Sequence, residues 1–130
     1  PFMKKVILVL EDDRDAMKVT STVFQQEGYK VVEAVSVPEA VTAVRTERID
    51  LAVIDIKMPI VDGYEFCKFL RRGETYSHIP IVIVTGEERR YGKETAENLK
   101  IEEFIEKPYD PRTLAEKAKK ILGLPGEKCK

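Results

Sequence analysis

The sequence predicts a single α/β domain built on a five-stranded parallel sheet. Short apolar runs recur along the 130 residues, segments with helical spacing lie between them, and turn residues separate the two. The runs Val6 to Leu10 and Leu51 to Ile54 are apolar at every position, as is typical of strands buried on both faces. Right-handed crossovers then place helices on both faces of the sheet.

Composition excludes several classes of protein. Hydrophobic residues make up 43% and charged residues 35%, and no apolar run is long enough to span a bilayer, so we expect a soluble protein without a membrane partner. Twenty-two Lys and Arg against 23 Asp and Glu give a net charge of −1, which offers no general attraction to nucleic acid. The length suits one domain with one core.

The cysteine and histidine content narrows the chemistry. Cys67 and Cys129 lack a CxxC spacing, and His78 is the only histidine, so a disulfide scaffold and a zinc site built on several His or Cys ligands are excluded. Without a secretory leader, the chain is expected to be cytoplasmic with free thiols.

The predicted elements alternate. Strands are expected at 4–10, 29–34, 50–55, 80–84 and 103–106. Helices are expected at about 16–27, 37–47, 63–72, 87–98 and 111–122. We expect the domain to comprise residues 3–123, with a tail at 124–130, and we leave Pro1 and Phe2 out of the predicted fold.

Local signals set the helix limits. Gly28 stops the first helix, Ser36 and Glu39 form a capping box for the second, and Asp110 caps the last. The segment 87–98 is almost wholly charged, so we expect the weakest and most mobile helix there.

Apolar spacing predicts which helical faces are buried. The recurring positions are Ala16, Val19 and Val23 in the first helix, with Thr20 and Phe24 beside them, Phe66, Cys67 and Leu70 in the third, and Leu114, Ala118, Ile121 and Leu122 in the last. Phe69 falls to one side of its helix face, so it is either a surface aromatic available to a partner or an edge of the core.

Four acids are expected to meet at one edge of the sheet. The simplest doubly wound arrangement, the flavodoxin-like order 2-1-3-4-5, puts the ends of the first and third strands side by side. Glu11, Asp12 and Asp13 follow the first strand, and Asp55 ends the third. Like charges so crowded need a cation. Oxygen-only ligands favour Mg²⁺ or Ca²⁺, and few ligands with open water positions favour Mg²⁺.

The chain resembles the receiver domain of response regulators, the CheY-like family of two-component signalling, from residue 4 to about 122. The matching features are Glu11-Asp12, Asp55, the run Met58-Pro59-x-x-Asp62-Gly63, Thr85 and Lys107-Pro108, all at strand ends and in this order. The resemblance implies that Asp55 accepts a phosphoryl group from a partner's phosphohistidine. It also implies that Asp12 binds Mg²⁺ directly and Glu11 through water, with the Lys57 backbone carbonyl as a further ligand.

These roles agree with the chemistry of the side chains. Mg²⁺, Lys107 and the Thr85 hydroxyl can neutralise charge on the phosphoryl oxygens during attack by Asp55. Each residue taken alone also has an ordinary structural interpretation. Lys107 would then be a solvated loop lysine, and Thr85 would be a helix N-cap. Phe104 stands where the family often has a switching aromatic residue, and ordinary strand packing explains it equally well.

The resemblance also implies partners. They are a sensor histidine kinase or a histidine phosphotransfer protein, and an output partner at the 87–122 surface. Phosphorylation is expected to shift the 87–109 surface and to change hydrogen exchange in residues 85–107. The domain then acts as a regulatory switch that catalyses only its own phosphoryl transfer and hydrolysis. Departures from the family pattern, at Lys57, Glu87 and Lys100-Ile101, bear on rates.

Three other classes of protein fit the sequence less well. A flavodoxin-like electron carrier would need a phosphate-binding first loop, which the acids at 11–13 would repel. A haloacid-dehalogenase phosphatase would need a second acid where Lys57 stands. A degenerate receiver that only binds proteins would not need an intact phosphorylation site, so the intact set of residues here argues against that class.

Two further expectations concern the end of the fold. We expect a cis Lys107-Pro108 peptide, because proline makes that isomer accessible and the lysine must turn back to Asp55. No output segment follows the last helix, so we expect either a single-domain regulator or part of a longer one.

Overall fold

A parallel five-stranded sheet forms the centre of the molecule. The computed structural model describes residues 2–56, 61–86, 97–123 and 126–128. The sheet contains β2 (Val6–Leu10), β3 (Lys30–Ala34), β4 (Leu51–Ile56), β5 (Ile81–Thr85) and β6 (Glu103–Glu106). Its order is β3-β2-β4-β5-β6, so the predicted order, 2-1-3-4-5 among the five predicted strands, is confirmed.

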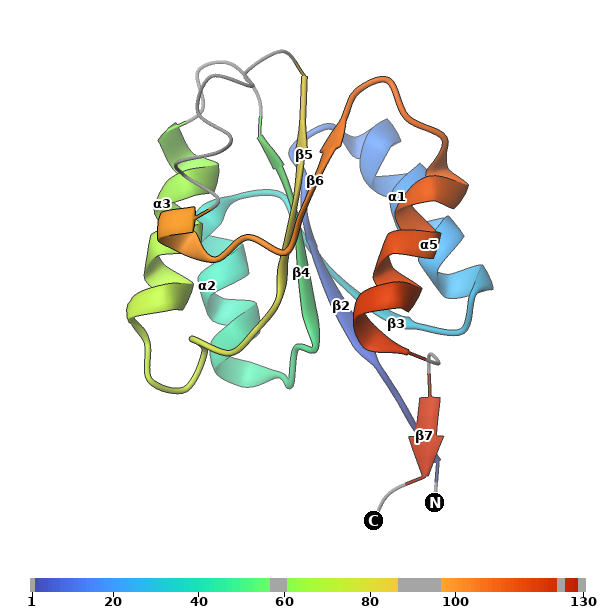
Figure 1. The fold of residues 1–130 in the computed structure, drawn as a ribbon, viewed down its shortest axis with the longest axis horizontal. Coiled ribbons are helices and arrows are strands. Elements are labelled where there is room, and N and C mark those ends of the chain that lie inside the picture. The colour runs from blue at the N-terminus through green and yellow to red at the C-terminus, as the bar shows by residue number, and fades with distance from the viewer. Residues whose placement is uncertain (1, 57–60, 87–96, 124–125, 129–130) are drawn as a thin grey trace.

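Helices cover both faces of this sheet. Figure 1 shows α2 (Val37–Thr46) and α3 (Val61–Arg72) on one side, and α1 (Arg14–Gln26) and α5 (Pro111–Leu122) on the other. The carboxyl ends of the parallel strands lie at the top of that view. None of the described helices is long and apolar enough to span a bilayer.

Alternating side chains feed two core layers. In β2, Leu8 and Leu10 pack with α2 and α3, whereas Ile7 and Val9 pack with α1 and α5. β4 and β5 divide in the same way, and nearly all of these side chains are fully buried. Because strand side chains point to opposite faces in turn, a strand covered on both sides must be apolar throughout. The continuous apolar runs of the sequence therefore have this physical cause.

Three predicted helix-end signals are confirmed, although α1 and α3 each begin about two residues earlier than predicted. The Ser36 hydroxyl accepts from the Glu39 amide at 3.3 Å, and the Asp110 carboxylate accepts from the Arg112 amide at 2.9 Å. Gly28, just after α1, has a φ of 98°, a conformation that glycine adopts without steric cost.

The buried face of α1 was predicted only in part: Thr20 and Phe24 are buried as expected, but Val19 is not. Met17, Thr20, Ser21 and Phe24 are its buried residues, whereas the Val19 side chain is 51% exposed. The buried face is turned toward Met17 and Ser21, which the spacing of Ala16, Val19 and Val23 did not include. The faces of α3 and α5 are confirmed: Phe66, Cys67 and Leu70 are fully buried in α3, and Leu114 and Ala118 are buried in α5, with Ile121 and Leu122 packed beside them.

Phe69 lies at the edge of the core. It is partly buried against the α2–α3 core layer, stacks on Phe66 and Tyr76 at centroid distances of 6.1 and 5.7 Å, and lies under the Arg45 guanidinium. These contacts favour the core-edge interpretation over a free surface aromatic.

A second, two-stranded sheet lies outside the main one. β1 (Phe2–Lys4) pairs antiparallel with β7 (Gly126–Lys128), and Figure 1 shows this ribbon below the body of the domain. The prediction that Lys4 belongs to the first sheet strand is therefore wrong, as is the omission of Phe2 from the fold. Strand β7 lies in the segment 124–130 that we expected to be a tail. Of the predicted helix 87–98, residues 87–96 lie outside the described residues, and 97–99 are helical.

Candidate functional site

The site lies where the central strands end. Asp55 is near the end of β4, and its side chain is only 7% exposed. Thr85 is the last residue of β5 and is buried, and Lys107 follows β6 directly. The parallel register joins these ends, because Asp55 is paired with Val84 and Thr85 with Glu106. Chain segments far apart in sequence thus present polar groups at one edge.

Lys107 contacts Asp55 directly. Its Nζ atom lies 2.6 Å from Oδ2 of Asp55, and the lysine side chain is 33% exposed. Its backbone amide donates to the Thr85 carbonyl at 2.7 Å, which fixes the lysine to the end of β5. The Lys107-Pro108 peptide bond is cis, as predicted. This contact contradicts the alternative that Lys107 is a solvated loop lysine.

The second oxygen of Asp55 has no such partner. Oδ1 is buried and accepts no hydrogen bond from any described residue. Buried carboxylate oxygens are almost always satisfied by donors or by a cation, because removing them from water is costly. A buried oxygen of this kind is therefore a place for a group that the described residues do not supply.

The acids after β2 have separate roles. Glu11 is buried, and its Oε2 accepts from the Asp13 amide at 2.9 Å, while Asp12 is exposed. The Asp13 carboxylate caps α1 by accepting from the Asp15 and Ala16 amides at 2.9 and 3.2 Å. Asp13 is thus a helix cap, which leaves Glu11 and Asp12 as the acids of this loop that can face a cation.

The register brings the ends of β2 and β4 together, with Leu10 paired to Ile54. In the described part of the chain, however, no three His, Cys, Asp or Glu side chains are grouped closely enough to hold a metal ion by themselves. A hollow of about 330 Å³ borders Glu11 and Asp12, between the β3–α2 loop and the start of α3. The predicted ligand carbonyl of Lys57 lies outside the described residues.

Thr85 and Phe104 lie on the same side of the sheet. Ile83 and Phe104 are register partners in β5 and β6, and both pack in the core layer under α2 and α3. Thr85 is two residues after Ile83, so its side chain points to that same face. Phe104 is only partly buried on this face. Because β6 pairs directly with β5, Phe104 and Thr85 lie on adjacent strands.

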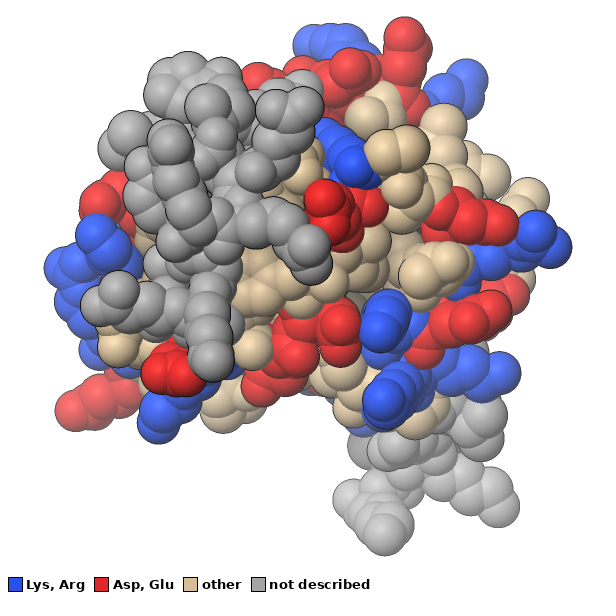
Figure 2. Space-filling view, turned by 45° about the horizontal axis from the view of Figure 1, so that its top comes forward, with Lys and Arg blue, Asp and Glu red and all other residues tan. Residues whose placement is uncertain are grey.

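Charge around the site is mixed. On the face that Figure 2 shows, the described acidic and basic side chains are interspersed, in agreement with the net charge of −1. A local arrangement of named residues, rather than a field of one sign, therefore distinguishes this edge.

The fold and the site together define a signalling domain. The family model of the response regulator receiver domain matches residues 7–119. The chain therefore belongs to this family, which is part of two-component signalling. It is a regulatory domain rather than an enzyme acting on a separate substrate.

Particular relatives agree. The chain is 32% identical over 120 residues to the alkaline phosphatase synthesis transcriptional regulatory protein PhoP of Bacillus subtilis, covering 92% of this chain and 49% of the relative. It is 31% identical over 116 residues to the response regulator SaeR of Staphylococcus aureus, covering 89% of this chain and 50% of that protein. The chain thus spans about half the length of these curated relatives.

Solved structures show the same fold. The chemotaxis response regulator CheY4 of Vibrio cholerae superposes with a TM-score of 0.82 at 27% identity, covering 92% of this chain and 100% of that one. A CheY-like receiver domain from Methanospirillum hungatei gives a TM-score of 0.83 at 29% identity, covering 92% and 94%.

Proposed function

We propose that this receiver domain is a phosphoacceptor switch in which Asp55 takes a phosphoryl group from a phosphohistidine. The donor is a sensor histidine kinase or a histidine phosphotransfer protein. The observation that carries the proposal is the Asp55 carboxylate, with Oδ2 held by Lys107 at 2.6 Å and Oδ1 buried without a donor from the residues that the structure describes. Such an arrangement is costly for structure alone, and it favours a chemical role.

The oxygen donors at this edge fit Mg²⁺. We infer that Glu11, Asp12 and Asp55 hold the ion, with the Lys57 backbone carbonyl as a further ligand. The unsatisfied Oδ1 of Asp55 supports this assignment, and Mg²⁺ ordinarily keeps several water ligands, so a few protein oxygens suffice. When bound, the ion neutralises charge on the phosphoryl oxygens.

The protein's own groups account for the rest of the transfer. An Asp55 oxygen attacks phosphorus, the phosphorus–nitrogen bond breaks, and its electron pair remains on the donor imidazole. Lys107 and the Thr85 hydroxyl, both fixed at neighbouring strand ends, donate to the phosphoryl oxygens. Later attack by water on phosphorus releases phosphate and restores the carboxylate. The domain thus acts catalytically only on its own aspartyl group.

The output is a shift between two conformations. Movement of Thr85 toward the phosphoryl oxygens would alter the face on which Phe104 packs, and with it the 87–109 surface. A shift from mostly off to mostly on takes roughly 5 kcal/mol of differential binding, which new charge-assisted bonds to Thr85 and Lys107 could supply. We infer that an output partner binds the 87–122 surface.

Incubation with acetyl phosphate and Mg²⁺, followed by intact mass measurement, tests the proposal. We expect one added phosphoryl group on the parent chain, none on Asp55→Asn, and none after chelation of Mg²⁺. Equal modification of Asp55→Asn would contradict the assignment of the acceptor. A failure of the folded parent chain to react would favour a receiver that only binds proteins.

A further inference from the structure

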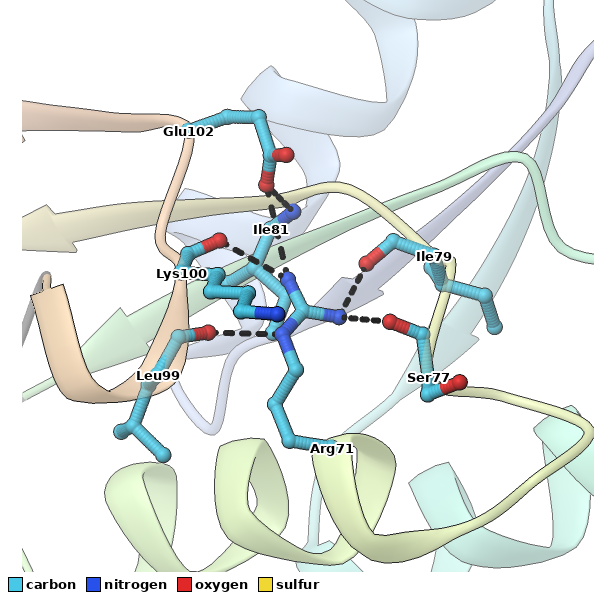
Figure 3. Close-up of polar contacts among 7 residues, drawn as sticks. All are labelled: Arg71, Ser77, Ile79, Ile81, Leu99, Lys100 and Glu102. Atoms are coloured by element: carbon cyan, nitrogen blue, oxygen red, sulfur yellow. Dashed lines mark hydrogen bonds and ion pairs between the residues drawn. The ribbon is translucent and has the colours of Figure 1, made fainter.

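Arg71, in the last turn of α3, joins the segments that lead into β5 and β6. Its Nε atom donates to the Leu99 carbonyl at 2.6 Å, and its Nη2 atom donates to the Lys100 carbonyl at 3.0 Å. Its Nη1 atom donates to the Ser77 and Ile79 carbonyls at 3.0 and 2.7 Å. Figure 3 shows one guanidinium between these two chain segments.

The guanidinium satisfies carbonyls that lack a helical partner. Leu99 ends the helical residues 97–99, so its carbonyl is among those that a helix leaves unbonded. The Arg71 side chain is only 12% exposed, so water has limited access to compete for these bonds. A planar guanidinium with five donors can hold several fixed acceptors at once, which a lysine ammonium cannot reproduce.

The same contact fixes an unusual backbone conformation. Lys100 has a φ of 52°, in the left-handed region that residues other than glycine seldom adopt. The Leu99 and Lys100 carbonyls belong to the two peptide planes that flank the Lys100 Cα atom, and Arg71 bonds to both. Arg71 therefore holds a turn for which glycine would be the usual residue.

Glu102 connects this turn to the sheet. Its Oε1 atom accepts from the Ile81 amide at 2.9 Å and lies 3.5 Å from Nη2 of Arg71, and its own amide donates to the Ile81 carbonyl at 3.0 Å. The beginnings of β5 and β6 are thus fixed to α3. The other ends of the two strands meet at Lys107 and Thr85, in the proposed phosphorylation site.

We propose that Arg71 is a positioning residue that fixes the 99–102 end of the connection between β5 and β6, so that the response to phosphorylation is confined to the Thr85 and Lys107 end. The inference rests on the proposed function and narrows it. Any displacement of 99–102 would break several bonds to a charged donor together, whereas the Phe104 side chain is only partly buried, although its strand is paired with β5.

Three backbone amides report the two ends separately. Ile81 and Glu102 donate within the Arg71 end, and Lys107 donates to Thr85 at the site end. Their hydrogen exchange, measured by NMR on the full chain with and without Mg²⁺ and beryllofluoride, tests the proposal. In the parent chain we expect exchange to change at Lys107 and to stay the same at Ile81 and Glu102.

Replacement of Arg71 should remove this difference. In Arg71→Met, which keeps an unbranched apolar stem but removes the donors, we expect exchange at Ile81 and Glu102 to become roughly 10- to 100-fold faster, and to respond to beryllofluoride. Arg71→Lys should resemble Arg71→Met. Arg72→Met, an exposed neighbour on the same helix, is the matched control and should behave like the parent.

A second substitution separates the turn from general stability. Lys100→Gly removes the steric cost of the left-handed conformation, so the effect of Arg71→Met on exchange should be smaller in that background. The role of Arg71 in fixing 99–102 would be contradicted if Arg71→Met changed exchange equally in both backgrounds. Exchange in Arg71→Met as slow as in the parent would contradict it as well.

In the parent, beryllofluoride could change exchange at Ile81 and Glu102 as much as at Lys107. That result would contradict a response confined to the Thr85 and Lys107 end. If beryllofluoride changed nothing and acetyl phosphate left the parent unmodified, the phosphorylation account and the confinement would both fail. The comparison of amide exchange between Arg71→Met and the parent, both without beryllofluoride, would still test whether Arg71 fixes 99–102.

Discussion

The Nζ atom of Lys107 lies 2.6 Å from Oδ2 of Asp55, although 52 residues separate the two in the chain. Parallel pairing of β4, β5 and β6 makes this contact possible, because each strand delivers its last residues to the same edge. The lysine occupies one carboxylate oxygen, and the other is buried and accepts no hydrogen bond from the described residues. This division of the two oxygens is the basis of the predictions on the site.

Removal of the Lys107 ammonium should slow phosphorylation without preventing folding. In Lys107→Ala we expect the rate of modification by acetyl phosphate to fall roughly 10- to 100-fold, because a donor to the transferring phosphoryl group is lost. Lys117→Ala is the matched control, since Lys117 is 35% exposed and pairs with Glu103 at 3.2 Å, away from Asp55. A Lys107→Ala rate equal to that of Lys117→Ala would contradict a role for the ammonium.

Asp12 and Asp13 should separate metal binding from helix capping. Asp12→Ala should abolish Mg²⁺ binding, measured by calorimetry, and phosphorylation with it. Asp13→Ala should keep both, because the backbone amide that holds Glu11 remains, but should lower the free energy of unfolding by about 1 kcal/mol through loss of the α1 cap. The assignment of Asp12 is wrong if its alanine variant is phosphorylated at the parent rate.

Asp50 should matter for stability and not for phosphorylation. Its Oδ2 atom accepts from the Val6 amide at 2.8 Å and pairs with Arg48 at 3.1 Å, which fixes the start of β2. Asp50→Ala should lower the free energy of unfolding in urea by about 2 kcal/mol, because a largely buried amide loses its acceptor. Asp50→Asn, which keeps an oxygen at that position, should cost less than half as much.

The Cys67 thiol should be unreactive in the folded chain. Burial raises its pKa to about 12, so at pH 8 almost none of it is thiolate. In a Cys129→Ser background we expect alkylation by iodoacetamide to be slower than in urea by roughly a thousand-fold or more. The unfolded thiol loses its proton near its ordinary pKa of about 8.5, so this group lowers stability as the pH rises above that value toward 12. Rapid labelling of the native chain at pH 8 would contradict this burial.

The sequence predicted the parts of the fold that depend on local chemistry. The Ser36 and Asp110 caps and the cis bond at Pro108 are confirmed, and each has a signature in residue type and spacing. The strand order is confirmed too, and it follows from the alternation of buried strands with helices, for which the doubly wound arrangement is the simplest. The contact of Asp55 with Lys107 was also predicted, since both residues follow strands that end at one edge.

The remaining features depend on contacts that have no such signature. Arg71 was missed because its partners are mainly backbone carbonyls, which every residue carries. Val19 was assigned to the buried side of α1 because the helical spacing of apolar residues alone cannot reveal that Met17 and Ser21 are buried instead. The pairing of β1 with β7 joins the two ends of the chain, and neither segment has the apolar alternation of a half-buried strand.

The most direct test of the central claim is to locate the phosphoryl group on the chain. An aspartyl phosphate is reduced by borohydride to homoserine, which tandem mass spectrometry can identify in a peptide. After treatment with acetyl phosphate and Mg²⁺, the account predicts homoserine at position 55 and none at positions 12, 13 or 62. Homoserine at another aspartate, or a phosphoryl group that resists borohydride on a hydroxyl side chain, would contradict it.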